Sequence, residues 1–175
     1  MSQSSYGLQQ IKKELQHLGT AQMADLCIRL ARYKKENKEL LAYLLFEAHD
    51  EQAYLEQAKE ENNTLFNQLP AQSYNVAKAI RKILKLNNKH SKFAASKTFE
   101  LELTIHFCDN YLEHVNRNTF YKPLRMVFIR QVQKALSLLA KLPEDLQFDY
   151  NDELHSLLTA ADQQLSWFNK NQFLP

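Results

Sequence analysis

Glycine and proline are scarce in this chain. Its 175 residues include 2 glycines and 4 prolines, whereas average usage would give about 12 and about 9. Tight turns between strands need residues at positive φ, most often glycine or asparagine, so a sheet protein of this length is hard to build from so few. We therefore expect an all-α fold, an irregular bundle of about eight helices. A short α-solenoid of helical hairpins is the second choice, because no internal repeat is evident.

Long apolar runs and a strong net charge are also missing. The longest apolar run, Leu40 to Phe46, is far shorter than the roughly 20 residues that cross a bilayer. The N-terminal stretch has no apolar core of signal-peptide length. The net charge of +2 comes from 22 basic and 20 acidic side chains, so no overall field draws the protein to nucleic acid or to a membrane. We expect no membrane partner.

Cysteine is rare as well. Cys27 and Cys108 are the 2 cysteines, and both lie among apolar neighbours at helical spacing. Reduced, buried thiols are the expected state, and they fit a cytoplasmic protein. The sequence leaves a disulfide between them open.

Apolar residues at helical period are what the chain does contain. Together with capping residues, they predict helices over about residues 8–18, 20–30, 38–48, 50–69, 72–88, 99–116, 123–142 and 151–168. Gly19 is expected to close the first helix, and Asp50 and Asn151 to cap the fourth and the eighth. No linker is long enough to argue for two domains, so we expect a single helical domain over residues 1–175.

The third predicted helix is apolar on all sides, which is typical of a helix enclosed by its neighbours. It is therefore expected to form the centre of the core, with four leucines among the most buried residues: Leu40, Leu41, Leu44 and Leu45. Acids and a histidine follow it at the junction with the next helix: Glu47, His49, Asp50 and Glu51. At such a junction they are expected to act as caps rather than as metal ligands.

A run of basic residues is the first candidate site. Residues 62–99 contain no acid and seven Lys or Arg residues. The candidate binding residues are Lys78, Arg81, Lys82, Lys85 and Lys89, four of which recur at i, i+4, i+7 and i+11 on one helical face. A second acid-free window, residues 114–143, adds six more bases. Such segregation predicts a surface for an acidic protein or another polyanion.

Two observations weigh against a nucleic-acid surface or a free basic face. Aromatic residues, which would stack on single-stranded nucleic acid, are lacking between residues 77 and 92. In addition, Pro70 should fold the fourth and fifth helices into an antiparallel hairpin. That hairpin would place three acids beside three of the bases, in the pairs Glu51–Lys89, Glu56–Lys85 and Glu60–Arg81, and would neutralise much of the face.

A polar strip on the sixth predicted helix is the second candidate. Its members are Glu102, His106, Asp109 and Glu113, spaced i, i+4, i+7 and i+11. Carboxylates and an imidazole on successive turns could hold a divalent metal or perform acid–base chemistry. However, no Glu-x-x-His or His-Glu-x-x-His motif accompanies them. The favoured interpretation is a solvent-facing strip that binds no metal.

The function predicted from these patterns is a non-enzymatic interaction or scaffold module that uses the basic face. No catalytic residue and no cofactor is assigned. The alternative is a metal-dependent enzyme or metal-binding bundle that uses the Glu/His/Asp strip. Partner identity and oligomeric state are left open.

Overall fold

The computed structural model describes residues 6–173, and this range contains α-helices and no strand. The prediction of an all-α fold with about eight helices is therefore confirmed. The α-helices are α1 (Leu8–Leu15), α2 (Thr20–Tyr33), α3 (Lys35–Ala42), α4 (Glu51–Asn67), α5 (Ser73–Ala94), α6 (Lys97–His114), α7 (Lys122–Leu139) and α8 (Glu144–Gln164). A π-helical turn, η1 (Tyr43–Glu47), follows α3, and a 3-10 turn, η2 (Lys170–Gln172), follows α8.

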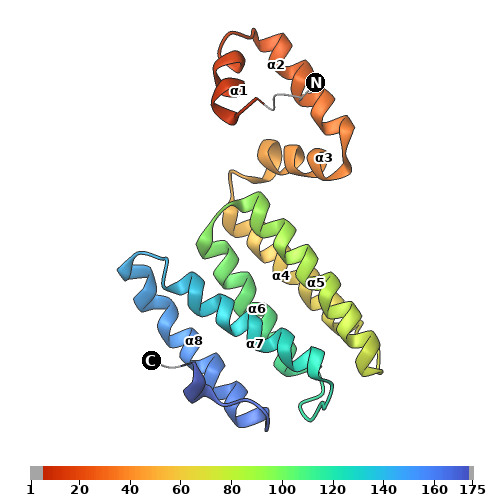
Figure 1. Cartoon of the computed structure of the whole chain (residues 1–175), viewed down its shortest axis with the longest axis vertical. Helices are drawn as coiled ribbons and strands as arrows, with labels where there is room; N and C mark the ends of the chain where they lie inside the picture. Colours follow the sequence, from red (N-terminus) through yellow and green to blue (C-terminus); the bar gives the residue numbers. More distant parts are fainter. Residues whose placement is uncertain (1–5, 174–175) are drawn as a thin grey trace. The chain divides into compact units, whose positions relative to one another are not determined.

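The chain forms two compact units, Met1–His49 and Asp50–Pro175. The N-terminal unit holds α1 to α3 with η1, and the C-terminal unit holds α4 to α8 with η2 (Figure 1). A single domain over residues 1–175 stays a prediction.

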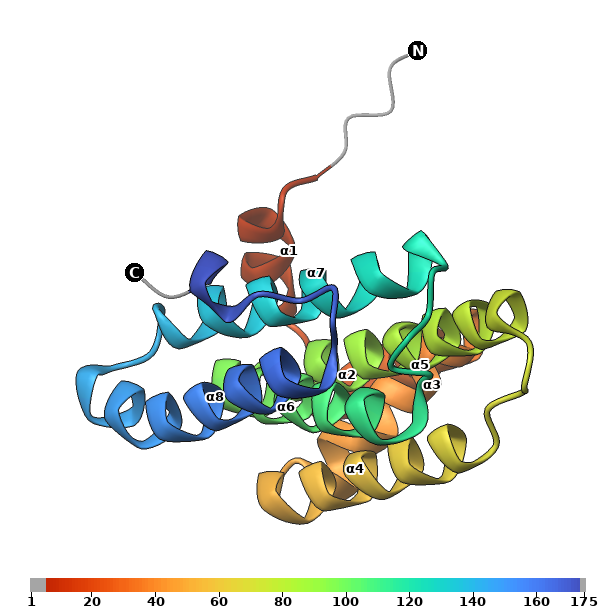
Figure 2. The same ribbon diagram turned by 90° about the horizontal axis from the view of Figure 1, so that it is seen from below.

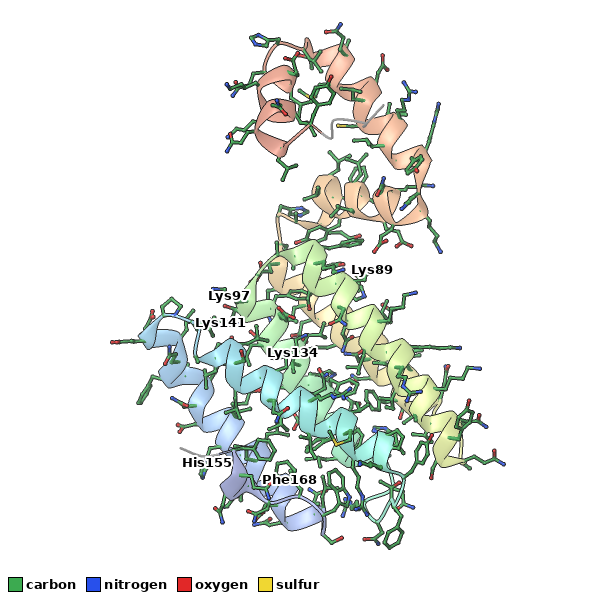
Figure 3. All side chains as sticks on the ribbon, in the orientation of Figure 1. Lys89, Lys97, Lys134, Lys141, His155 and Phe168 are labelled. Carbon is green, nitrogen blue, oxygen red and sulfur yellow. The ribbon has the colours of Figure 1, made fainter. Side chains whose placement is uncertain are left out.

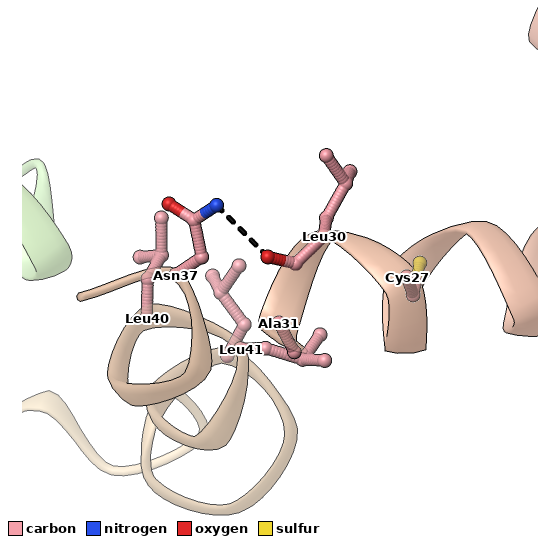
Figure 4. A pocket seen from close by; sticks show the side chains of 7 residues that line it. Cys27, Leu30, Ala31, Asn37, Leu40 and Leu41 are labelled. Atoms are coloured by element: carbon pink, nitrogen blue, oxygen red, sulfur yellow. Dashed lines mark hydrogen bonds between the residues drawn. The ribbon is translucent and has the colours of Figure 1, made fainter. Parts of the chain in front are cut away.

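The N-terminal unit has little core of its own. No residue of α1, α2 or α3 is buried. Helix α2 packs against α3, and the side-chain amide of Asn37 donates a hydrogen bond of 2.9 Å to the carbonyl oxygen of Leu30 (Figure 4). Beside this bond, Cys27, Leu40 and Leu41 line an apolar pocket between the two helices.

The expected core position of the third helix is wrong. Leu40 and Leu41 are only half-buried, and Leu44 and Leu45 are 56% and 64% exposed. A unit of this size has too few layers to enclose a helix on every side. The helix also widens into the π turn at Tyr43–Glu47, and Leu44 in this turn lines the apolar pocket beside α2 without being enclosed by it.

Helix α6 is the centre of the larger unit. It packs against α4, α5, α7 and α8, and Figures 1 and 2 show it enclosed by these four helices. Its apolar residues cover most of its circumference, and seven of them are at most 1% exposed: Phe99, Leu101, Leu103, Ile105, Phe107, Cys108 and Tyr111. The apolar all-round pattern that indicates burial therefore belongs to α6.

The capping predictions met different outcomes. Asp50 caps α4 as expected, since its carboxylate accepts a 2.9 Å hydrogen bond from the backbone N–H of Ala53. Gly19 does not close α1. It is the N-cap of α2, and its backbone N–H donates to the side chain of Gln22 at 3.0 Å.

Two helix boundaries also differ from the prediction. Helix α5 continues through the expected polar link to Ala94, because His90 is held by the Tyr54 hydroxyl at 2.7 Å and by the Glu61 carboxylate at 3.1 Å. Helix α8 begins at Glu144, directly after Pro143, so Asn151 lies inside the helix and is not its cap.

Candidate functional site

The cations of α5 lie on the side of the helix that faces solvent. At about 100° per residue, its six Lys and Arg side chains occupy an arc of roughly 100° opposite the buried Ile80, Ile83 and Asn87. We call four exposed members of this arc, which lie close together along the helix, the basic ridge: Lys78, Arg81, Lys82 and Lys85. Lys92, near the C-terminal end of α5, is also exposed. The fold therefore presents four of the five predicted binding residues on one exposed helical face.

The acids of α4 do not neutralise the basic ridge. Helices α4 and α5 pack against each other and run side by side in opposite directions (Figure 1). However, Glu56 pairs with Lys59 of its own helix at 3.0 Å, and Glu51 and Glu60 form no ion pair with α5 within residues 6–173. The predicted hairpin is thus correct, but the three predicted ion pairs between α4 and α5 are not formed among the described residues.

Lys89, the fifth predicted residue, differs from the other four. It is half-buried, and its Nζ lies 5.9 Å from the ring centroid of Phe93. Figure 3 shows Lys89 near the C-terminal end of α5. Because this ammonium group already has contacts, we do not include it in the basic ridge.

Two of the six cations in the second basic window, residues 114–143, make internal contacts. Lys134 (Figure 3) forms a 2.6 Å ion pair with Glu100 of α6. Arg125 donates to the carbonyl oxygen of Thr119 at 2.6 Å, and its guanidinium lies 5.4 Å from the ring centroid of Trp167. Of the α7 cations, Lys122 and Arg130 are exposed. Arg117 and Lys141, on either side of α7, are exposed as well, so the exposed cations of this window are spread over residues 117–141, whereas the basic ridge gathers its cations within residues 78–85.

The polar strip of α6 does not lie uniformly in solvent, which corrects the prediction. Glu102 is half-buried between two other helices: its carboxylate accepts hydrogen bonds from Lys59 of α4 at 3.1 Å and from the Tyr150 hydroxyl of α8 at 2.7 Å. Burial and the Glu102 carboxylate raise the pKa of the Tyr150 phenol, which keeps it in the donating form. Burial lowers the pKa of Lys59, but the neighbouring Glu56 and Glu102 carboxylates outweigh this and raise it overall.

His106, also half-buried, belongs to a polar seam along the contact between α4 and α6. Its Nε2 lies 2.8 Å from the side-chain oxygen of Asn63, which also accepts from Asn110 at 3.1 Å. One turn beyond Asn63 and Asn110, the Nε2 atom of His114 lies 3.0 Å from the side-chain oxygen of Asn67. Desolvation by burial lowers the pKa of His106, so its imidazole is held neutral as a structural hydrogen-bonding group.

The other half of the strip faces away from α4. Glu113 is exposed. Asp109 is accessible to water at its surface, yet desolvation raises its pKa to about 6, and the negative charge of Glu153 on α8 contributes. Burial, and then the charge of Glu102, raise the pKa of Glu153 as well. The four strip residues therefore do not converge on one point.

This geometry gives no support to the metal alternative. In the part of the chain that the structure describes, no group of three or more His, Cys, Asp or Glu side chains is arranged to hold a metal ion. Glu102 and His106 are committed to Lys59, Tyr150 and Asn63 instead. The strip is best explained as polar contacts that join α4, α6 and α8.

Sequence reasoning did not identify the partners of the strip. A signal was present in the i, i+4 ladders: Lys59, Asn63 and Asn67 on α4 match His106, Asn110 and His114 on α6. Two polar ladders of the same period on neighbouring helices predict a shared interface. The contribution of Tyr150 was not foreseeable, because the eighth helix was expected to begin only after it.

Comparison of the chain with protein-family models, curated proteins and solved structures finds no match. Among residues 6–173, no helix has the length and apolarity needed to cross a membrane. Function must therefore be inferred from the charges and contacts of the chain itself.

Proposed function

We propose that this protein is a non-enzymatic interaction module whose basic ridge docks an acidic protein surface. The observation that carries the proposal is the combination of exposure and missing counter-charge. Lys78, Arg81, Lys82 and Lys85 are exposed, and none forms an ion pair within the described residues. A cytoplasmic location is part of the proposal, since the free thiols of Cys27 and Cys108 suit a reducing compartment.

The crowding of the four cations gives the ridge its binding potential. Lys78 and Lys85 are seven residues apart on one helix, which corresponds to about 10 Å along the axis. This is close to the screening length of about 8 Å at physiological salt, so the potentials of the cations add. Like charges at i, i+4 also repel one another. An acidic partner would relieve this repulsion as it binds.

A protein surface fits the ridge better than nucleic acid does. The exposed face of α5 offers a single aromatic residue, Tyr74, at its N-terminal end, whereas single-strand binding relies on several stacked aromatics. The chain as a whole is nearly neutral, with a net charge of +2, and therefore lacks the overall basicity typical of nucleic-acid-binding domains.

The proposal can be tested with fluorescently labelled polyglutamate as the acidic probe, titrated by anisotropy at physiological ionic strength. The wild type is compared with Lys82→Glu/Lys85→Glu and with a matched control, Lys12→Glu/Lys13→Glu. The control makes the same change in net charge on the exposed lysines of α1. We expect saturable, salt-sensitive binding by the wild type and by the control, and at least about a tenfold loss of affinity in the ridge variant.

Two results would contradict the proposal. In one, the wild type does not bind polyglutamate at low salt, or both double variants lose the same affinity, which would indicate a nonspecific charge effect. In the other, a short DNA duplex titrated in parallel binds through the ridge while polyglutamate does not. The ridge would then be a nucleic-acid surface.

A further inference from the structure

Helix α8 has the opposite charge pattern to α5. It carries six Asp or Glu residues and no Lys or Arg, whereas α5 carries six Lys or Arg residues and no acid. Within residues 6–173, none of the α8 acids forms an ion pair. Three exposed aspartates share the outward face of α8, and we call them the acidic ridge: Asp145, Asp149 and Asp152. The C-terminal unit thus has two helices with uncompensated charge of opposite sign.

The two ridges have the same spacing. Asp145, Asp149 and Asp152 stand at i, i+4 and i+7, and so do Lys78, Lys82 and Lys85. Helix α5 has 22 residues and α8 has 21, so the two helices have nearly the same length. When α8 of one molecule lies along α5 of another, a single alignment of the two helices can place the three acids beside the three cations.

The ridges cannot meet within one molecule. Figures 1 and 2 show α8 at one edge of the C-terminal unit and α5 at the other, with α6 and α7 between them. Helix α8 packs against α6 and α7, and it has no comparable packing against α5. The complementary charges are therefore available only to another molecule.

Each ridge also carries an exposed aromatic side chain. Phe148 lies between Asp145 and Asp149 and is 75% exposed, and Tyr74 precedes Lys78 by one turn and is 66% exposed. Exposed aromatics beside charged residues are frequent anchors of protein interfaces, because they bury a large apolar area at a small entropic cost. Ions in solution would screen the charges but would not cover these rings.

We propose that the acidic protein docked by the basic ridge is a second copy of this chain, which presents its acidic ridge. This inference rests on the proposed function and names the partner. Because the two contacting surfaces differ, the contact is heterologous, and a pair of copies keeps two free ridges: the acidic ridge of one copy and the basic ridge of the other. Repetition of the contact produces head-to-tail chains unless the rotation between copies closes a ring. The association is concentration-dependent and weakens as salt rises.

The test uses the full chain in sedimentation velocity across a range of concentration and salt. Wild-type protein is expected to self-associate, with an association constant that falls about tenfold or more between about 50 mM and about 300 mM salt. Two variants each remove the charge complementarity between the ridges: Lys82→Glu/Lys85→Glu cancels the net positive charge of the basic ridge, and Asp149→Lys/Asp152→Lys makes the acidic ridge positive. Each variant alone should sediment as a monomer, and an equimolar mixture should associate again, because the first variant keeps the acidic ridge of α8 and the second keeps the basic ridge of α5.

The same experiment can overturn the proposal. The Lys12→Glu/Lys13→Glu control should associate like the wild type, and its monomerisation would show that net charge, not the ridges, is responsible. The proposal that the partner is a second copy of the chain would be contradicted if the wild type stays monomeric at low salt, or if the mixture of the two variants stays monomeric. If that wild type still binds polyglutamate through the ridge, the proposed function stands and only this inference fails. If it binds neither, both fail.

Discussion

The location of the core can be tested by deleting buried carbon atoms from α6. Ile105 is 1% exposed inside the main apolar cluster. Ile105→Ala removes three carbon atoms, which corresponds to roughly 2.4 kcal/mol of lost transfer free energy at about 0.8 kcal/mol each. The unfilled cavity adds to this, so we expect a loss of about 3–4 kcal/mol in the free energy of unfolding. Leu44→Ala deletes the same number of atoms from a side chain that is 56% exposed, and should cost less than about 1 kcal/mol.

Urea unfolding provides the assay, with two probes. Trp167 is the only tryptophan of the chain. Its ring packs against Phe128 and Phe168 of the C-terminal unit, and Figure 3 labels Phe168. Its fluorescence therefore reports the unfolding of that unit. Far-UV circular dichroism reports the helices of the whole chain. The midpoint of Ile105→Ala should fall in both signals with an unchanged slope, which identifies a change in stability.

A fall in the unfolding midpoint of Leu44→Ala as large as that of Ile105→Ala would contradict the location of the core. That result would mean that the third predicted helix is part of the packed core after all. The location of the core would also be contradicted if Ile105→Ala had no measurable effect.

Three further predictions concern titration, backbone conformation and thiol chemistry. Burial raises the pKa of Asp109 to about 6, from an ordinary 3.8. The folded state therefore favours the protonated carboxyl: this contribution to the free energy of unfolding is fully present below about pH 4 and is lost as the pH rises through 6. Asp109→Asn should therefore be more stable than the wild type at pH 7.5, by about 1 kcal/mol after solvent screening, and should lose this advantage at pH 4. Urea unfolding at both pH values measures the difference, and an equal effect at the two pH values would refute the prediction. Ala95 ends α5 in the left-handed region at φ 52°, so Ala95→Gly should raise the free energy of unfolding by up to about 1 kcal/mol, and a thermal midpoint that falls would contradict this. Cys108 is buried and burial raises its pKa, whereas Cys27 is half-exposed, so Ellman's reagent should modify Cys27 rapidly and Cys108 only on unfolding; rapid modification of Cys108 would contradict the structure.

The features that could be predicted from the sequence depend on local rules. The scarcity of glycine and proline excludes most sheet folds, and the spacing of Ile80, Ile83 and Leu84 opposite the α5 lysines orients that helix correctly. The cap at Asp50 is likewise a matter of neighbouring residues. For the candidate site, the exposure of Lys78, Lys82 and Lys85 follows from the same one-helix periodicity.

The features that could not be predicted depend on which helices become neighbours. Leu44 and Leu45 have the same apolar character as the buried leucines of α6, and only the number of packed neighbours separates the two cases. The sequence of α6 alone predicts a solvent-facing strip at Glu102 and His106, because it contains no information about contacts with Lys59 or Tyr150 on other helices. The continuation of α5 past Asn88 depends similarly on the contacts of His90 with α4.

Lysine footprinting tests the central claim, that the basic ridge is the interaction surface, most directly. The protein is acetylated briefly, alone and with a saturating amount of polyglutamate, and the modification rate of each lysine is read by mass spectrometry. If the basic ridge is the interaction surface, bound polyglutamate slows the acetylation of Lys78, Lys82 and Lys85 and leaves the rates at Lys12 and Lys13 unchanged. Uniform protection of all five lysines, or no protection at the ridge despite bound polyglutamate, would contradict this claim.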